Sequence, residues 1–227
     1  MSEVVVAHPA ATVILLRDVR DGCEVLLVRR NAQLAFHGGA WVFPGGRIDA
    51  EDYAAGATTD PAIAAAYAAV REAREEAAVN VRAEELVLFS RWLTPENVPR
   101  RFDTWFFAAR AGEEQVQVDG GEIHAHCWLA PDRALAQQQA GEIELPPPTY
   151  VTLTQIAPYR TVSDALSGLR ERFEYFLPRL RVGAQGACTV YHGDVAYEDD
   201  DADRPGPRHR LWLTDSGWRY ERSGAGS

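Results

Sequence analysis

The sequence predicts an α/β fold: a mixed β-sheet flanked by helices, followed by a helical and hairpin extension. Two observations predict it. Strand-like and helix-like segments alternate over residues 8–145, and after the triple proline 146–148 come two helical and two alternating apolar segments. The 227 residues suffice for one substantial core with an extension. We therefore expect a core, residues 8–145, and an extension, residues 146–227, packed on it within one structural domain.

The core begins with a predicted hairpin. Residues 11–17 and 24–30 are rich in Val, Ile and Leu, and the polar turn 18–22 joins them. A short strand at 41–43 then enters Pro44-Gly45-Gly46, where glycine allows positive φ and a close approach of the backbone to a ligand. We expect a hairpin that leads to a glycine turn at a binding site.

A long helix follows the glycine turn. The small, polar residues 49–59 predict a loop, and Asp60-Pro61 predicts a helix start, with Asp as N-cap and Pro in the first turn. The helix runs to about Val79. The residues expected to face the sheet are Ile63, Tyr67, Val70, Ala73 and Ala77. Small Ala68 and Ala69, one turn before the acidic end of the helix, are expected to leave room for a substrate.

The remaining elements complete the sheet and the extension. Residues 86–93, 102–109 and 120–129 predict strands, and residues 131–140 predict a helix. In the extension we expect helices at 149–157 and 163–176, with Ser163 as N-cap, and strands at 189–197 and 208–214. This order is typical of a mixed sheet with helices on its faces.

Composition excludes several classes of function. All 23 basic side chains counted as Lys or Arg are arginine, so a P-loop or a Schiff-base lysine is excluded. The net charge of −10 argues against general nucleic-acid binding. No apolar run approaches the ~18 residues that span a bilayer, so we expect a cytoplasmic protein without membrane contact, with a homodimer as an open option. The three scattered cysteines predict neither disulfides nor a zinc site.

The acidic end of the long helix carries the strongest chemical signal. Glu72, Glu75 and Glu76 are spaced i, i+3, i+4, so they project from one face of the helix. Clustered carboxylates suit a hard divalent ion, Mg²⁺ or Mn²⁺, which joins protein oxygens to substrate phosphates. The alternative is an ordinary solvated face, in which Arg71 and Glu75 form a weak i, i+4 pair. The glycine turn upstream favours the metal site.

These residues resemble the signature of the Nudix hydrolase family, G-x5-E-x7-R-E-U-x-E-E-x-G-U, where U is a bulky aliphatic residue. The matching residues are Gly46, Asp52 in place of the Glu, Arg71, Glu72, Glu75, Glu76 and Val79. Ala73 and Ala78 depart from the pattern, and eighteen residues, 53–70, stand where it has seven. The long insert resembles the branch that cleaves coenzyme A and acyl-CoA. The resemblance implies an α/β/α sandwich over residues 8 to 145.

The resemblance also implies roles. Glu72, Glu75 and Glu76 would hold Mg²⁺ or Mn²⁺, with Asp52, or Glu51, as a further ligand. Arg71 would orient the carboxylates rather than touch the substrate. Glu122, after a Gly-Gly turn at a strand start, is the candidate for a further ligand or a base; its alternative is an exposed structural glutamate.

The substrate would be a small nucleotide: a nucleoside diphosphate linked to another group. The stretch Leu26–Ala32, followed by Phe43–Gly46, resembles the coenzyme A branch at its two ends. The residues expected to contact the substrate are Arg29, Arg30, Gly45, Gly46, Arg47, Arg100 and Arg101. Pro95 lies at the distance after the signature that the ADP-ribose branch tends to show. Three hypotheses stay open: cleavage of coenzyme A or acyl-CoA, cleavage of ADP-ribose or a similar derivative, and a binding module with little turnover.

Overall fold

A computed structural model describes residues 5–33, 38–96, 98–118, 120–214 and 217–224 of the chain. Its centre is an eight-stranded sheet with the order β3-β2-β1-β6-β5-β8, with β4 paired to β1 and β7 to β2. The strands are β1 (His8–Val19), β2 (Gly22–Arg30), β3 (Trp41–Val42), β4 (Gly45–Arg47), β5 (Val87–Leu93), β6 (Phe102–Arg110), β7 (Ile123–Leu129) and β8 (Glu174–Phe176). Strands β1 and β6 run parallel, as do β5 and β8, and the other pairs are antiparallel, so the predicted mixed sheet is confirmed.

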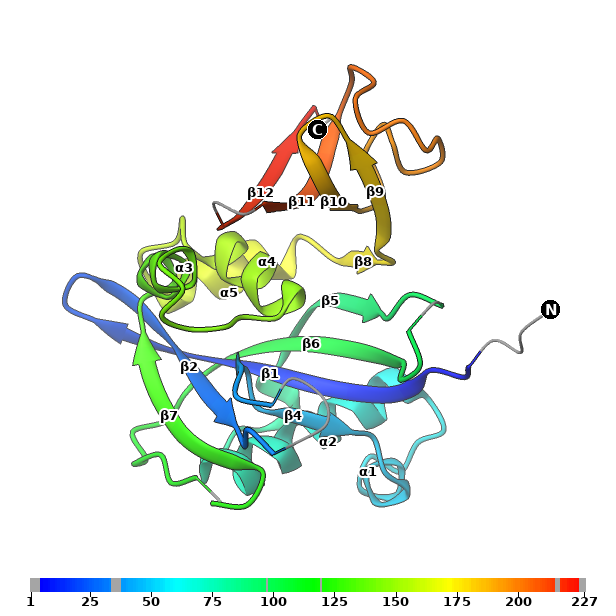
Figure 1. Cartoon of the computed structure of the whole chain (residues 1–227). Helices are drawn as coiled ribbons and strands as arrows, with labels where there is room; N and C mark the ends of the chain where they lie inside the picture. The colour runs from blue at the N-terminus through cyan, green and yellow to red at the C-terminus, as the bar shows by residue number, and fades with distance from the viewer. Residues whose placement is uncertain (1–4, 34–37, 97, 119, 215–216, 225–227) are drawn as a thin grey trace.

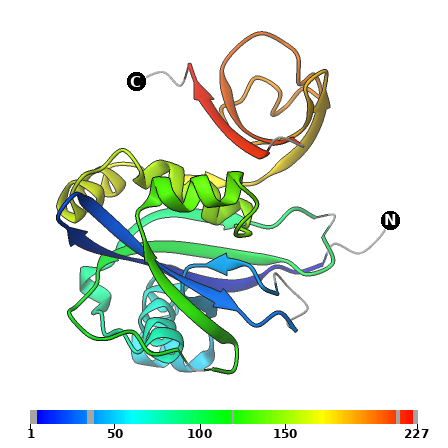
Figure 2. The same cartoon turned by 60° about the vertical axis from the view of Figure 1, so that its left-hand side comes forward.

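Helices cover both faces of this sheet (Figures 1 and 2). The helices are α1 (Ala50–Ala55), α2 (Pro61–Ala77), α3 (Pro131–Gln139), α4 (Pro147–Ile156) and α5 (Val162–Arg170), with a 3₁₀ turn at Ala83–Glu85. Helix α2 packs its alanines on one face, and α3, α4 and α5 cover the other. The predicted α/β/α sandwich is therefore confirmed. No helix in the described ranges is long and apolar enough to cross a bilayer.

Helix α2 begins as predicted and differs in how it packs. The Asp60 side chain accepts a hydrogen bond from the Ala62 N–H at 2.8 Å, with Pro61 in the first turn. Ile63, expected against the sheet, is 46% exposed. Ala68 and Ala69 are fully buried against the sheet instead, so they leave no room for a substrate. Their small side chains let the helix approach the strands closely.

Two predictions around the glycine turn were wrong. Residues 49–59 contain helix α1, because Asp49 caps it and Asp52 reaches back to the Asp49 N–H at 2.8 Å. Gly45 and Gly46 lie in strand β4 and neither has positive φ. Close packing selects glycine there: a Cβ at Gly45 would lie 2.6 Å from the backbone oxygen of Ala11 on the adjacent strand.

The extension also differs from prediction in its details. Helix α5 is capped by Thr161 rather than Ser163, and it ends at Arg170, because residues 174–176 join the sheet as β8. A second, four-stranded sheet follows, in the order β12-β11-β10-β9. Its strands are β9 (Arg179–Gly183), β10 (Gly186–Val190), β11 (Arg208–Thr214) and β12 (Gly217–Ser223). The sequence had indicated β11, but the strand expected at 189–197 was wrong beyond Val190, because residues 191–197 form turns.

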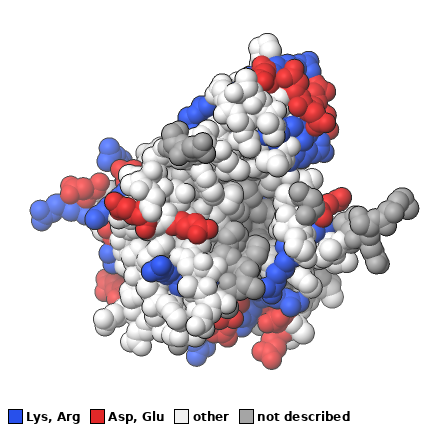
Figure 3. Space-filling model, in the orientation of Figure 1, with Lys and Arg blue, Asp and Glu red and all other residues white. Residues whose placement is uncertain are grey.

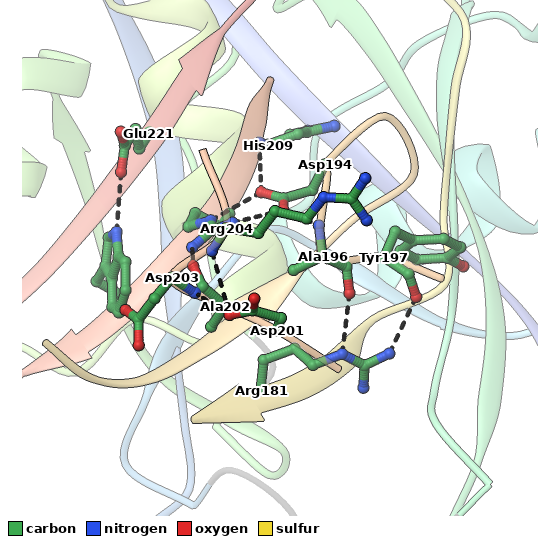
Figure 4. Close-up of polar contacts among 12 residues, drawn as sticks. Arg181, Asp194, Ala196, Tyr197, Asp201, Ala202, Asp203, Arg204, His209 and Glu221 are labelled. Atoms are coloured by element: carbon green, nitrogen blue, oxygen red, sulfur yellow. Dashed lines mark hydrogen bonds and ion pairs between the residues drawn. The ribbon is translucent and has the colours of Figure 1, made fainter. Parts of the chain in front are cut away.

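This C-terminal sheet stands over helices α3 to α5 (Figures 1 and 2). Aromatic rings join it to the core: Trp92 of β5 stacks on Phe176 of β8 at 4.0 Å between ring centroids, and Tyr191 meets both edge-on. The sheet is held internally by a fully buried ion pair, in which Arg210 donates to both oxygens of Asp194 at 2.6 and 2.7 Å. The His209 N–H also bonds this carboxylate (Figure 4).

Candidate active site

A cleft of about 760 Å³ opens between the central sheet and the C-terminal sheet. The core contributes both glycines of β4, the end of α2, parts of β5 and β6, and several charged side chains. The extension contributes Pro146, Pro147, Pro148, Thr149, Pro178, Thr189 and Tyr191. The cleft is large for a ligand site, since such cavities span ~300–1,000 Å³. It therefore has room for more than a diphosphate.

Glu76 lies at the inner wall of this cleft. It sits on the last turn of α2, is 6% exposed, and accepts a hydrogen bond from the Gly45 N–H at 2.9 Å. Burial raises the pKa of Glu76 to about 8, and the Gly45 N–H opposes that rise only in part. Burial makes the ionised form of Glu76 unfavourable, and a cation bound beside it would stabilise that form.

Glu72 lies one turn before Glu76 and also lines the cleft. Its side chain is 12% exposed, and burial raises its pKa, although Arg71 opposes the rise. Its Oε1 lies so near β4 that a Cβ at Gly46 would approach it to 2.1 Å. Glycine is therefore needed at residue 46 because a side chain there would collide with the Glu72 carboxylate, and not because of the backbone angles of Gly46.

Arg71 ties the acidic end of α2 to its surroundings. It donates from Nε and from one terminal nitrogen to the two oxygens of Asp52 at 3.0 and 3.1 Å. It also donates to Glu72 at 2.8 Å, to Glu75 at 3.0 Å and to the Arg47 carbonyl at 2.9 Å. The hydrogen bonds to Asp52 hold the pKa of Arg71 above its usual range. This geometry agrees with an orienting role for Arg71.

Asp52 does not join the carboxylates at the cleft. It is 3% exposed, its two oxygens are engaged by Arg71 and by the Asp49 N–H, and it is absent from the cleft lining. Glu51, the alternative ligand, is exposed on α1 and is also absent from the lining. The expectation of a metal ligand at either position is therefore not supported. Asp52 instead positions Arg71.

Two more acidic side chains reach the cleft from less buried positions. Glu75 is 58% exposed and Glu122, just before β7, is 66% exposed. Glu122 lies 3.9 Å from a terminal nitrogen of Arg30, and its charge contributes to the raised pKa of Glu72 and Glu76. The structure thus places Glu122 at the cleft with the α2 carboxylates, and its role as a ligand or a base stays a prediction.

The predicted substrate arginines divide into two groups. Arg30, Arg47 and Arg100 line the cleft with both β4 glycines. Arg29 does not, because it bonds the Gly39 carbonyl beside a separate pocket. Arg101 is 5% exposed and donates to the carbonyls of Thr94 and Val5, so it holds the backbone. The structure therefore does not support substrate contact by Arg29 or Arg101. Arg29 and Arg30 are adjacent on β2, so their side chains point to opposite faces of the sheet, whereas Arg101 precedes β6 and is held by backbone carbonyls.

The donor chemistry of the cleft fits a hard divalent cation. Glu72, Glu75, Glu76 and Glu122 offer oxygen alone, and their mutual repulsion is only partly balanced by Arg30 and Arg71. Among the described residues, no three acidic, His or Cys side chains are already gathered around one point. Glu72 and Glu75 bond Arg71, and Glu76 bonds Gly45, so binding would require these side chains to turn.

Comparison with known proteins identifies the family. The NUDIX domain model matches residues 6–148, well over half of the chain. The chain belongs to the Nudix family. The signature at α2 and the β4 glycines thus lie in the part of the chain that the Nudix domain model covers.

Curated relatives match about half of this Nudix chain. Human acyl-coenzyme A diphosphatase NUDT19 is 33% identical over 49% of the chain and 32% of its own length. Putative nudix hydrolase 7 of Caenorhabditis elegans is 26% identical over 59% of the chain and 56% of its own length. The chain therefore spans between a third and about half of the length of these two relatives.

Solved structures agree with the Nudix fold. A NUDIX hydrolase from Alicyclobacillus acidocaldarius is 26% identical with a TM-score of 0.64, over 73% of this chain and 97% of its own. The NUDIX domain of Shewanella oneidensis NrtR, crystallised with ADP ribose, has a TM-score of 0.51 at 15% identity, over 66% of this chain and 86% of its own. The second likeness concerns the fold alone.

Sequence reasoning missed the far wall of the cleft. Pro178, Thr189 and Tyr191 lie 100 or more residues after the signature helix and meet the cleft only because the C-terminal sheet folds over the core. Alternating polarity at 189–197 indicated a strand there, but no local pattern shows which face of that strand meets another element.

Proposed function

We propose that this protein is a divalent-metal-dependent hydrolase that cleaves the pyrophosphate bond of a nucleoside diphosphate linked to another group. One observation carries the proposal: the buried Glu76 and the largely buried Glu72 line a large cleft beside the β4 glycines, with arginines around it. Burying two carboxylates together is unfavourable unless a cation joins them. The negative charge of a phosphate-bearing ligand would then be balanced by the bound cation and the arginines around the cleft.

The position of each cleft residue indicates a different role. Glu72, Glu75 and Glu76 would hold Mg²⁺ or Mn²⁺, which when bound neutralises phosphate charge and acidifies a water molecule. Arg71, locked by Asp52, keeps Glu72 and Glu75 at the cleft end of α2. Arg30, Arg47 and Arg100 bind phosphate oxygens, for which the guanidinium group offers paired donors.

Glu122 is our candidate for the base that accepts a proton from the attacking water. It lines the cleft, and one of its carboxylate oxygens lies 3.9 Å from a terminal nitrogen of Arg30. Its side chain is 66% exposed, so solvent water can reach its carboxylate.

For the substrate we propose coenzyme A or acyl-CoA, cleaved to 3′,5′-ADP and (acyl-)phosphopantetheine. The long insert before Arg71 and the likeness to relatives named acyl-coenzyme A diphosphatase support this choice. The volume of the cleft agrees with a substrate longer than a nucleotide. The second candidate is ADP-ribose or a related derivative, which one observation favours: Pro95 lines the cleft.

A product-release assay with Mg²⁺ and with Mn²⁺ tests these choices. Coenzyme A, acetyl-CoA, ADP-ribose, NADH and a diadenosine polyphosphate are compared at equal concentration, and products are identified by mass. Formation of 3′,5′-ADP supports the first choice, whereas preference for ADP-ribose supports the second. No cleavage of any substrate with either metal would favour a binding module with little turnover.

Glu76→Gln tests the assignment of the carboxylate cluster. It keeps the shape of the side chain and removes its charge, so turnover should fall by roughly 10²-fold, the scale of removing one preorganised electrostatic group. The matched control is Glu84→Gln, an exposed glutamate on the 3₁₀ turn that pairs with Arg82. Equal activity of the two variants would refute the assignment.

A further inference from the structure

The two faces of the C-terminal sheet differ sharply in charge. Strand pairing places two rows of side chains on its inner face, toward the core: Leu180, Thr189, Leu211 and Tyr220, then Val182, Ala187, Leu213 and Trp218. None of the eight is charged; the next row on this face, His209 and Arg222, contains an arginine that pairs with Glu174 of β8. The alternate positions form the outer face, with Arg179, Arg181, Arg210, Arg219 and Glu221 among them. Figure 3 shows charged side chains gathered where Figure 1 draws the loop between β10 and β11, beside this sheet.

The core covers only half of the inner face. Leu211 is fully buried in the core cluster, and Leu213, Trp218 and Tyr220 pack against it. At the other end of the same two rows, Leu180 is 59% exposed and Val182 is 71% exposed. Large apolar side chains left open in this way mark a surface that contacts something else.

This open half is continuous with the cleft. Pro178 and Thr189 line the cleft, and Leu180 lies directly across from Thr189 in the pairing of β9 with β10. Pro178, Leu180 and Val182 alternate along one side of the chain, so they form a line that leads away from the cleft. We call the surface formed by Pro178, Leu180, Val182, Ala187 and Thr189 the apolar track.

The charged side chains of the cleft lie on its core side, away from the apolar track. The charged lining residues all come from core segments: Arg30, Arg47, Asp49, Glu72, Glu75, Glu76, Arg100 and Glu122. The lining residues from the extension are all uncharged, and Trp92, Leu93 and Phe106 of the core add apolar surface. A ligand that fits both ends therefore carries its phosphates on one side and an uncharged, apolar group on the other.

We propose that the apolar track binds the acyl chain of the substrate and makes the enzyme selective for acylated over free coenzyme A. This inference rests on the proposed function, since it assigns the far end of the same ligand. Four residue steps separate Pro178 from Val182, about 13 Å at 3.3 Å per residue. The track thus matches a medium-length chain, and its open end tolerates a longer one.

The test compares acyl-CoA species of increasing chain length. Free, acetyl-, hexanoyl- and decanoyl-CoA are assayed below the concentration at which they form micelles. A fully buried methylene contributes about fourfold in binding, and one that contacts protein on a single side about twofold. We expect kcat/KM to rise by at least about tenfold from acetyl- to decanoyl-CoA. Calorimetry with EDTA present should likewise show a higher affinity for decanoyl-CoA than for acetyl-CoA.

Substitutions on the track then locate the chain. In the Leu180→Ser/Val182→Ser variant the ratio of kcat/KM for decanoyl- over acetyl-CoA should fall to about threefold or less. Both side chains are largely exposed, so the fold should tolerate the change. The matched control is Val19→Ser, an exposed valine at the end of β1 outside the cleft, which should keep the wild-type ratio.

The outcomes separate the two proposals. If no coenzyme A species is cleaved, the proposed function fails and the track assignment fails with it. If acetyl-CoA is cleaved but the ratio is flat, or is unchanged in the double variant, the track assignment alone is wrong. In a further outcome, the double variant differs from the wild type in oligomeric mass by sedimentation while keeping the decanoyl-to-acetyl ratio of kcat/KM. That result would show that the track contacts a second copy of the chain, and it would overturn the track assignment.

Discussion

Replacing Gly46 by alanine should lower activity and leave the fold intact, because the new methyl group would meet the Glu72 carboxylate rather than the backbone. Its Cβ would lie 2.1 Å from Oε1 of Glu72, far inside van der Waals contact. The end of a glutamate side chain is flexible, so we expect Glu72 to turn away at a cost within about 1 kcal/mol of stability. Turnover should fall by about 10- to 100-fold, since one carboxylate leaves the cleft.

Gly45→Ala provides the contrast one residue earlier. Its Cβ would lie 2.5 Å from Thr12 Oγ1 and 2.6 Å from the Ala11 backbone oxygen, and a strand backbone cannot turn away. Overpacking of this kind costs about 1–3 kcal/mol, which in a domain of this size lowers Tm by roughly 2–12 °C. Gly45→Ala should therefore lose stability, whereas Gly46→Ala should lose mainly activity.

Two assays decide the matter: thermal unfolding followed by circular dichroism, and initial rates of coenzyme A cleavage at saturating metal. A Gly46→Ala protein with wild-type kcat/KM and an intact fold would refute the reasoning, because Glu72 would then not be needed where the structure places it. Equal losses of Tm in the two variants would show that backbone packing, and not the carboxylate, selects glycine at residue 46.

Three further predictions follow from single contacts. Asp52→Asn should lower kcat by about tenfold or more while the metal requirement persists, because Arg71 loses its paired acceptor; unchanged kcat in a rate assay would contradict a positioning role. Ala78→Gly should raise stability by about 0.5–1 kcal/mol in urea unfolding, since Ala78 ends α2 with a φ of 56°, where glycine carries no Cβ penalty; a loss of stability would contradict this. Burial raises the pKa of Asp194, but the hydrogen bonds from Arg210, His209 and Ala196 and the charge of Arg210 together outweigh it, so the net pKa is lowered. The stability contributed by this carboxylate is therefore present above the unfolded pKa of about 3.9 and is lost as pH falls through the folded value. Asp194→Asn should cost about 3–5 kcal/mol at pH 7 and progressively less below pH 4, and a difference independent of pH would refute the assignment.

The sequence by itself determined the features that depend on local spacing. An N-cap followed by proline starts a helix wherever the chain lies, and so Asp60 and Pro61 begin α2 as predicted. The i, i+3, i+4 spacing places Glu72, Glu75 and Glu76 on one face because a helix turns 100° per residue. The apolar segments likewise predicted the mixed sheet, although its strands β4 and β8 were missed, as were β9 and β12 of the second sheet.

Only the tertiary structure decided which of these side chains meet. Asp52 and Glu72 both carry carboxylates near Arg71, but α1 holds Asp52 between that arginine and the Asp49 N–H, whereas Glu72 lies at the cleft. Thr189 reaches the same cleft from more than a hundred residues later, through a sheet that folds over the core. Local periodicity fixes direction along one element, whereas contacts between distant elements depend on how faces pack, and that information is spread over the whole chain.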